Sequence, residues 1–222
     1  MSFLQQGIII SRPSSQFQIM LKFILLSAFL CGSCCVAATV ERASPGTVRY
    51  VVRTDPDWDR FTNNPSTDVQ KWFRSHVWRM MVFSPFWDGK LRWYPNAWIY
   101  QNLYAIYVGS EITKTHPEWI LKDRQGNKLY IPWGCHDGVC PQYAANISNP
   151  SYREHWIRNA QELEHKGYKG LWIDDVNLEF QVGDGTGKHA TPMNRPNGEE
   201  MPWEDWRRGM AEFTEQIRRA FP

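Results

Sequence analysis

The chain has 222 residues, of which 42% are hydrophobic and 22% are charged. This composition supports a sizeable core and excludes a disordered or fibrous protein. The formal net charge is +2, and residues 1–38 carry two basic residues and no acidic one, so the remainder is neutral. A neutral remainder offers no electrostatic footprint for nucleic acid, and no nucleic-acid partner is expected.

Residues 20–38 follow the order of a secretory signal peptide. After Met20, one lysine precedes the apolar run Phe23–Leu30, and small residues lead to Ala38. This pattern predicts a signal peptide over residues 1–38, cleavage after Ala38, and export to the periplasm or the cell exterior. Because Met20 is well placed to begin the signal, no fold is expected for the residues before it. The apolar run is shorter than the roughly 20 residues of a membrane helix, so no stable membrane span is expected.

The five cysteines divide into three in the leader and two in the mature chain. Cys34 follows small residues, as a lipidated cysteine does, but Cys31 stands where such a signal needs an aliphatic residue, so a lipoprotein is disfavoured. Cys135 and Cys140 remain after cleavage, and in an oxidising compartment they predict a disulfide. The segment between them also offers His136 to a zinc ion. Because no second close pair of ligands follows, the disulfide is favoured over a metal site.

The first part of the mature chain predicts two strands around one helix. Val48–Val52 has strand character, and the apolar run Val77–Phe83 forms a second strand that ends just before a proline. Between them, Ser66 or Thr67 caps a helix over Asp68–Ser75, in which apolar residues recur at helical spacing.

A long irregular segment, Ser84–Pro141, follows the second strand. It is dense in aromatic residues and in turn signals, and Ile120–Lys122 and Lys128–Ile131 flank Gly126 as the arms of a hairpin do. Loops of this length are usually functional or disordered, and this one is too aromatic for disorder. The segment is therefore expected to contribute to a functional site.

Regular structure then returns. The spacing predicts a third strand over Gln142–Ile147, a helix from Asn149 to His165, a fourth strand over Gly170–Asp174, and a last helix over Trp203–Ala220. A glycine-rich loop separates the fourth strand from that helix.

The alternation of strands and helices predicts an α/β fold with parallel strands joined by right-handed crossovers. We expect residues 39–222 to form the N-terminal half of a (β/α)8 TIM-type barrel, with a long aromatic-rich loop after strand 2. A closed barrel of this type takes about 250 residues. The chain is therefore expected to be truncated at its C-terminus, a fragment that is inactive alone.

Two carboxylates, Asp174 and Asp175, end the fourth predicted strand. In α/β barrels the reacting groups sit at the C-terminal ends of the strands. Alternation along a strand places Asp174 on the same face as Trp172 and turns Asp175 to the other face. Burying two adjacent carboxylates after an apolar strand costs free energy unless they are well paired or have a catalytic role. Both residues are therefore catalytic candidates. The structural alternative is that they cap the following turn or pair with arginines.

At this strand the sequence resembles a family. The run Gly-Leu-Trp-Ile-Asp at Gly170–Asp174 resembles the strand-four signature of many (β/α)-barrel glycosidases, in which the carboxylate that ends the strand is the nucleophile. The segments His116–Tyr130 and Asn146–Asn177 are similar to the uncharacterised "hypothetical glycosyl hydrolase" barrel families, which are distantly related to melibiase-like and polygalactosaminidase-like enzymes. The resemblance covers roughly Tyr50–Phe221.

The resemblance implies that Asp174 is the nucleophile or stabilises an oxocarbenium-like transition state. Glycoside hydrolysis needs two carboxyl groups, and the resemblance implies that the general acid comes from a later strand. Within the chain, Asp88 is the nearest alternative acid, followed by Glu179 and Asp184. The sequence departs from the amylase-type strand at Trp172, where an arginine usually helps to hold the nucleophile.

Aromatic side chains suit a sugar site because they offer flat apolar surfaces with polar edges. Trp72, Trp78 and Trp156 lie in regular elements and are expected to pack in the core. The residues expected to bind substrate are Trp87, Asp88, Tyr94, Trp133, Trp172 and Asn177, with Trp93, Trp98 and Tyr104 as further loop aromatics that could line a cleft. For any single loop aromatic, the alternative is a place in the core.

Three functions compete on these grounds. The first is an exported glycoside hydrolase acting on a poly- or oligosaccharide through carboxylate catalysis, with no cofactor. The second is a carbohydrate-binding barrel that lacks a working pair of acids. The third, least favoured, is a metal-dependent hydrolase using Asp174, Asp175, Asn177 and His136, because the spacing of these ligands is too loose to specify an ion.

Overall fold

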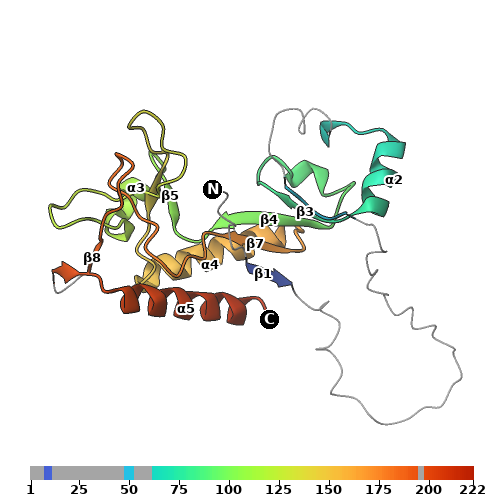
Figure 1. The fold of residues 1–222 in the computed structure, drawn as a ribbon. Helices are drawn as coiled ribbons and strands as arrows, with labels where there is room; N and C mark the ends of the chain where they lie inside the picture. The colour runs from blue at the N-terminus through green and yellow to red at the C-terminus, as the bar shows by residue number, and fades with distance from the viewer. Residues whose placement is uncertain (1–7, 12–47, 53–61, 195–197) are drawn as a thin grey trace, which may run out of the picture.

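The computed structural model describes residues 8–11, 48–52, 62–194 and 198–222 (Figure 1). Its centre is a five-stranded sheet in the order β1-β7-β4-β3-β2. Four strands run parallel to one another: β2 (Val48–Val52), β3 (Val77–Val82), β4 (Ala97–Asn102) and β7 (Gly170–Asp174). The predicted α/β class with parallel strands is confirmed. Within the described residues the strands form an open sheet.

Three helices accompany this sheet, and two of them begin at a residue whose side chain caps the helix. Helix α2 (Thr67–His76) follows Ser66, whose side chain accepts a hydrogen bond from the backbone of Val69. Helix α4 (Pro150–His165) starts after Asn149, which caps it in the same way. Helix α5 (Trp203–Ala220) has acidic residues in its first turn and basic residues in its last, which suits the helix dipole. All three predicted helices are confirmed.

The third strand of the sheet is β4, which corrects the prediction that Gln142–Ile147 fills this place. The predicted residues instead contain β6 (Gln142–Ala144), which pairs antiparallel with β5 (Ala105–Tyr107) in a separate two-stranded sheet. In β4 the run Ala97-Trp98-Ile99 is buried, and the strand pairs with β3 on one side and β7 on the other. The long excursion therefore follows the third strand and begins at Leu103.

Outside the main sheet the excursion is held by short elements and backbone hydrogen bonds. It contains α3 (Ile112–Thr115) and the 3₁₀ turn η2 (Pro117–Trp119). The predicted hairpin is present: the backbone of Leu129 donates to Leu121, and Gly126 adopts a positive φ of 85° at the turn. A further small hairpin, β8 (Met193–Asn194) with β9 (Glu199–Glu200), precedes α5.

Strand β1 (Ile8–Ser11) pairs antiparallel with the outer edge of β7. No fold was expected for this part of the leader. The reason for the difference is physical: three consecutive isoleucines favour extended backbone, and the edge of β7 presents unpaired backbone groups to them. The rest of the predicted signal peptide lies outside the described residues. In the part of the chain that the structure describes, no helix is both long and apolar enough to cross a membrane.

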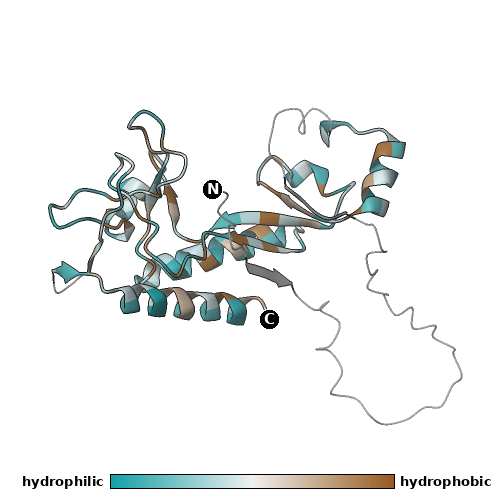
Figure 2. Ribbon diagram, viewed as in Figure 1, coloured by the Kyte–Doolittle hydropathy of each residue, from teal (hydrophilic) through white to brown (hydrophobic). Residues whose placement is uncertain are grey.

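The core holds most of the aromatic side chains that the sequence placed in loops. Figure 2 shows hydrophilic and hydrophobic bands alternating along α2 and α5, whose apolar sides pack inward. Phe73 of α2 packs against Trp93 and Tyr94, which also contact Trp87. Trp72 is an exception to the expected packing, because it is 50% exposed and stacks on His76.

Candidate active site

Asp174 is the last residue of β7, and its side chain is 7% exposed. The hydroxyl of Tyr100 on β4 donates a hydrogen bond of 2.8 Å to Oδ2, and the backbone N–H of Asp175 donates one of 2.9 Å to Oδ1. In the register of the two strands, Tyr100 lies opposite Trp172 and Asn102 lies opposite Asp174. Asp174 therefore shares one face of the sheet with Trp172, as alternation predicts.

Asp175 follows the strand in a left-handed conformation, with a φ of 58°. This conformation is uncommon for a residue with a side chain, and it ends the alternation of the strand. Its carboxylate accepts hydrogen bonds from Asn102, from Trp133 Nε1 at 3.1 Å and from Asn177 at 3.4 Å. The expectation that Asp175 turns to the opposite face is wrong, because the strand ends one residue earlier.

Burial raises the pKa of Asp175 above its ordinary value. Hydrogen bonds from Trp133 and Asn102 oppose this rise, while the neighbouring charge of Asp174 adds to it. Burial also raises the pKa of Tyr100, and the carboxylate of Asp174 adds to that shift. Tyr100 therefore remains a protonated donor to Asp174 across the range in which proteins are usually assayed.

A second set of hydrogen bonds fixes the groups that contact the two carboxylates. Trp156 on α4 donates 2.8 Å to the carbonyl oxygen of Asn102, and Trp206 on α5 donates 2.8 Å to that of Asn177. The side chain of Asn177 donates to the hydroxyl of Tyr104, which itself donates to the backbone of Gln181. Both helices thus hold the donors of Asp175 through buried aromatic side chains.

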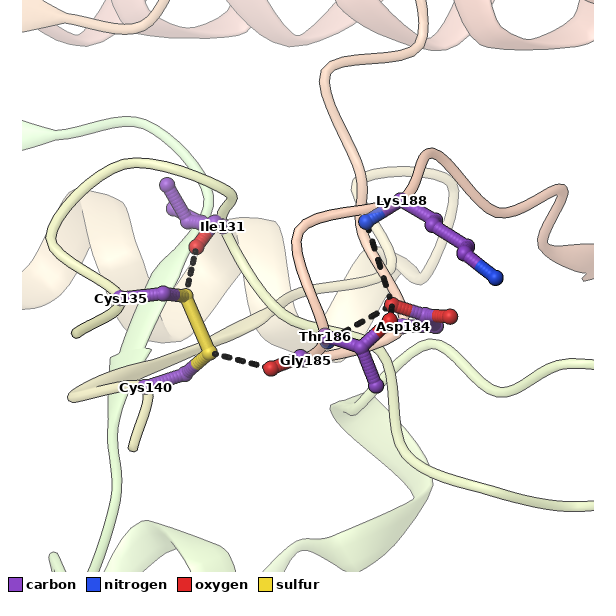
Figure 3. Close-up of a disulfide and its surroundings, with 7 residues drawn as sticks. All are labelled: Ile131, Cys135, Cys140, Asp184, Gly185, Thr186 and Lys188. Carbon is purple, nitrogen blue, oxygen red and sulfur yellow. Dashed lines mark hydrogen bonds between the residues drawn. A yellow bond between two sulfur atoms is a disulfide. The ribbon is translucent and has the colours of Figure 1, made fainter. Parts of the chain in front are cut away.

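A disulfide between Cys135 and Cys140 closes a short loop that begins two residues after Trp133, which confirms the predicted pairing. Figure 3 shows this loop beside the turn after β7: Cys135 Sγ lies 3.6 Å from the carbonyl oxygen of Ile131, and Cys140 Sγ lies 3.6 Å from that of Gly185. The bridge therefore ties the loop to the segment that follows the two carboxylates.

The predicted substrate-binding residues divide into two groups. Trp133 and Asn177 contact Asp175, and Trp172 is partly exposed on the face of Asp174. The expectation that Trp87 and Tyr94 bind substrate is corrected. Both residues are fully buried in the aromatic cluster beside α2 and present no surface to a ligand. Trp93, Trp98 and Tyr104 are buried as well. Sequence alone does not separate Trp133 from Trp87 and Tyr94, since all three lie in one aromatic segment.

Asp88, another residue that the sequence predicts to bind substrate, has its carboxylate engaged in a network of hydrogen bonds. Lys166 Nζ lies 2.8 Å from Oδ2, while Tyr168 and Ser84 donate hydrogen bonds of 2.6 and 2.8 Å to Oδ1. Burial acts to raise the pKa of Asp88, but the hydrogen bonds from Lys166, Tyr168 and Ser84 outweigh it and lower the pKa. These contacts tie the turn after β3 to the end of α4.

The two remaining acid candidates lie on the surface. Asp184 accepts hydrogen bonds from the backbone and the hydroxyl of Thr186 and stabilises its own turn, as Figure 3 shows. Glu179 is exposed. In the residues that the structure describes, no three His, Cys, Asp or Glu side chains gather as a metal site would require.

Sequence reasoning missed Tyr100 and Asn102, the β4 residues that donate to the two carboxylates. The signal was present as polar side chains at alternate positions, directly after the apolar run Ala97–Ile99. Such a run followed by polar groups marks the C-terminal end of a strand, where an α/β fold places its site.

No protein-family model and no curated protein matches the chain. The chain is structurally similar to the glycoside hydrolase domain of PelA from Pseudomonas aeruginosa, with 14% identity over 79% of this chain and 56% of that chain, and a TM-score of 0.47. The chain thus spans a little over half the length of that domain. At this identity the similarity concerns the fold alone.

Two further solved structures are similar. A hypothetical protein from Ruminiclostridium thermocellum has 14% identity and a TM-score of 0.46, over 79% of this chain and 93% of that chain. The α-galactosidase from Thermus thermophilus, in complex with p-nitrophenyl α-D-galactopyranoside, has 16% identity and a TM-score of 0.38, over 59% of this chain and 31% of that chain.

Proposed function

We propose that the chain belongs to an exported glycoside hydrolase and that Asp174 carries its principal catalytic charge. The observation that carries this proposal is the place of Asp174 at the C-terminal end of β7, where Tyr100 donates to one carboxylate oxygen. A carboxylate at this position can attack an anomeric carbon or stabilise an oxocarbenium-like transition state. The sequence resemblance at Gly170–Asp174 supports the same role.

In this proposal Asp175 is a positioning residue. Its carboxylate accepts hydrogen bonds from Asn102, Trp133 and Asn177, which come from three separate segments. It thereby positions these side chains around Asp174. A carboxylate that accepts bonds only from neutral donors is held without a cation.

The sugar would lie against the aromatic surface beside Asp174. Trp172 and Tyr100 face this side of the sheet, and the ring of Phe83 lies 4.8 Å from that of Tyr100. Trp133 is 41% exposed on the other side of the carboxylates. Pyranose rings present apolar C–H faces that pack well on such side chains.

A carbohydrate-binding protein without turnover is the second candidate. The observation that favours it is that the other two acids have partners of their own. Asp88 accepts hydrogen bonds from Lys166 and Tyr168, whereas Asp184 stabilises a surface turn. Neither carboxylate is placed as a general acid beside Asp174. Turnover decides between the two candidates.

The test is hydrolysis of a panel of aryl glycosides and polysaccharides by the full-length protein that contains this chain, and by its Asp174→Asn and Asp184→Asn variants, with release of phenol or reducing sugar as the readout. We expect Asp174→Asn to lower turnover at least about a thousandfold, while Asp184→Asn leaves it unchanged. Near-native turnover of Asp174→Asn would contradict the proposal. Sugar binding by the full-length protein without any turnover would establish the second candidate instead.

A further inference from the structure

A cleft of about 490 Å³ lies between the end of β3, the second half of β4 and one side of α4. It exists because the connection between β3 and β4 contains the 3₁₀ turn η1 (Asp88–Lys90) and no α-helix. In addition, β3 pairs with β4 only as far as Val82 and Ile99, so the rest of β4 has an open edge. One side of α4 therefore borders a hollow rather than another helix.

Two polar side chains in the lining of the cleft have buried atoms without hydrogen-bond partners. Gln101 of β4 is 9% exposed and its Oε1 is unpartnered, and the Oγ of Ser110 is unpartnered as well. Leaving such groups unsatisfied is unfavourable, and natural proteins contain few of them. Both atoms are shielded from solvent as they stand, so a bound donor would satisfy them once the side chains turn toward the cleft.

The lining carries little net charge. Lys166 is its lysine, and this side chain is already paired with Asp88 at 2.8 Å. Burial lowers the pKa of His155, so its imidazole is neutral at neutral pH. No aspartate or glutamate lines the cleft, whose lining residues all lie in the described part of the chain. These features disfavour a strongly charged ligand, whose charge would meet no free partner.

Aromatic and amide groups complete the lining. Phe83 and Tyr107, which is 59% exposed, both line the cleft. Asn159 of α4 adds an exposed amide to the lining. Flat apolar rings with neutral hydrogen-bonding groups are the features that a polyhydroxylated ligand requires.

We propose that this cleft is a second carbohydrate-binding site, which takes a neutral oligosaccharide. The cleft adjoins the carboxylate site, because Tyr100 and Asn102 of β4 line it and also donate to Asp174 and Asp175. Tyr100 and Asn102 donate to Asp174 and Asp175, whereas Gln101 between them points to the opposite face of the strand. A glycan held in the cleft stays attached to the protein independently of turnover at Asp174.

The test measures binding by calorimetry in an Asp174→Asn background, so that no substrate is consumed. The probes are neutral hexasaccharides of glucose, mannose and galactose, with a uronic-acid hexasaccharide as the charged comparison. Adding Gln101→Leu removes the amide while keeping a similar volume, and we expect it to weaken binding of a neutral probe at least tenfold. The matched control is Gln125→Leu, at an exposed turn away from the cleft, and it should leave the affinity unchanged.

Melting temperatures separate a binding role from a structural one. Because Gln101 contributes an unsatisfied buried group, Gln101→Leu should melt at or above the temperature of its parent. If this variant fails to fold, Asn159→Trp fills the cleft from its exposed side and should give the same loss of binding.

Affinity within twofold of the parent in these variants would overturn the proposal, as would binding of the uronic-acid probe alone or of no probe. These outcomes are independent of whether the native chain hydrolyses a glycoside.

Discussion

Asp175 and Asp88 are both partly or fully buried carboxylates at the ends of strands, but they are held in opposite ways. Asp175 accepts hydrogen bonds from neutral donors, and burial raises its pKa. The carboxylate of Asp88 accepts hydrogen bonds from a lysine and two hydroxyl groups, and these lower its pKa. The pKa values of the two acids therefore shift in opposite directions, because one carboxylate is held by neutral donors in a buried place and the other by a lysine and hydroxyl groups.

The largest expected difference is in stability. Asp175→Ala leaves the donors on Asn102, Trp133 and Asn177 without an acceptor, so we expect the free energy of unfolding to fall by about 3 kcal/mol. Asp88→Ala should lower it by only about 1–2 kcal/mol, because Lys166 is exposed enough to be solvated once the carboxylate is gone.

Urea denaturation of the two variants and of the native chain measures both changes. The matched control is Glu179→Ala, an exposed acid whose removal should leave the unfolding free energy nearly unchanged. Equal losses for Asp175→Ala and Asp88→Ala would show that the two acids are held alike.

The disulfide sharpens the same comparison, because it closes the short loop that directly follows Trp133, a partner of Asp175. Replacing both Cys135 and Cys140 by serine is expected to lower the free energy of unfolding by about 2 kcal/mol, as the closing of a short loop predicts. Thermal unfolding with and without a reductant provides the measurement. We expect the reductant to lower the melting temperature of the native protein but not that of the double variant. An equally small change in both melting temperatures would contradict this expectation.

The smallest expected effect is on the pH dependence of stability. Because the pKa of Asp175 is raised, its contribution to stability is present below the ordinary value of 3.8 and is lost as the pH rises through the raised pKa. The contribution of Asp88 has the opposite sign: it is present above 3.8 and is lost as the pH falls through the lowered pKa.

The two contributions can be separated by measuring unfolding free energies from about pH 3 to about pH 7. The proteins compared are the native chain, Asp175→Asn and Asp88→Asn. Relative to Asp175→Asn, the native chain should lose stability as the pH rises. Relative to Asp88→Asn, it should gain stability. The same slope for both variants would contradict the assignment of opposite shifts.

Much of this fold follows from local sequence patterns. Helices α4 and α5 and strand β7 have clear periodicity and caps, and the sequence placed all three correctly. The sequence misplaced the third strand of the sheet, since choosing between β4 and β6 depends on which distant strand each one meets. Local propensity carries no information about that choice.

Only part of the candidate site could be predicted, because the rest depends on contacts between distant segments. The position of Asp174 after an apolar strand is a local signal, whereas the burial of Trp87 and Tyr94 depends on packing against α2. The left-handed backbone of Asp175 is likewise imposed by its distant hydrogen-bond partners. Tyr100 and Asn102 could be found only once β4 was recognised as a strand.

The central claim is that the end of β7 is the reactive place and that the Asp88 network is structural. The most direct measurement is turnover of Asp174→Asn beside Asp88→Asn on a glycoside that the native protein hydrolyses, with melting temperatures of both. We expect Asp174→Asn to lose at least about a thousandfold in turnover while it stays folded, and Asp88→Asn to lose stability with turnover within about threefold of native. Loss of turnover in Asp88→Asn with activity retained in Asp174→Asn would contradict the claim.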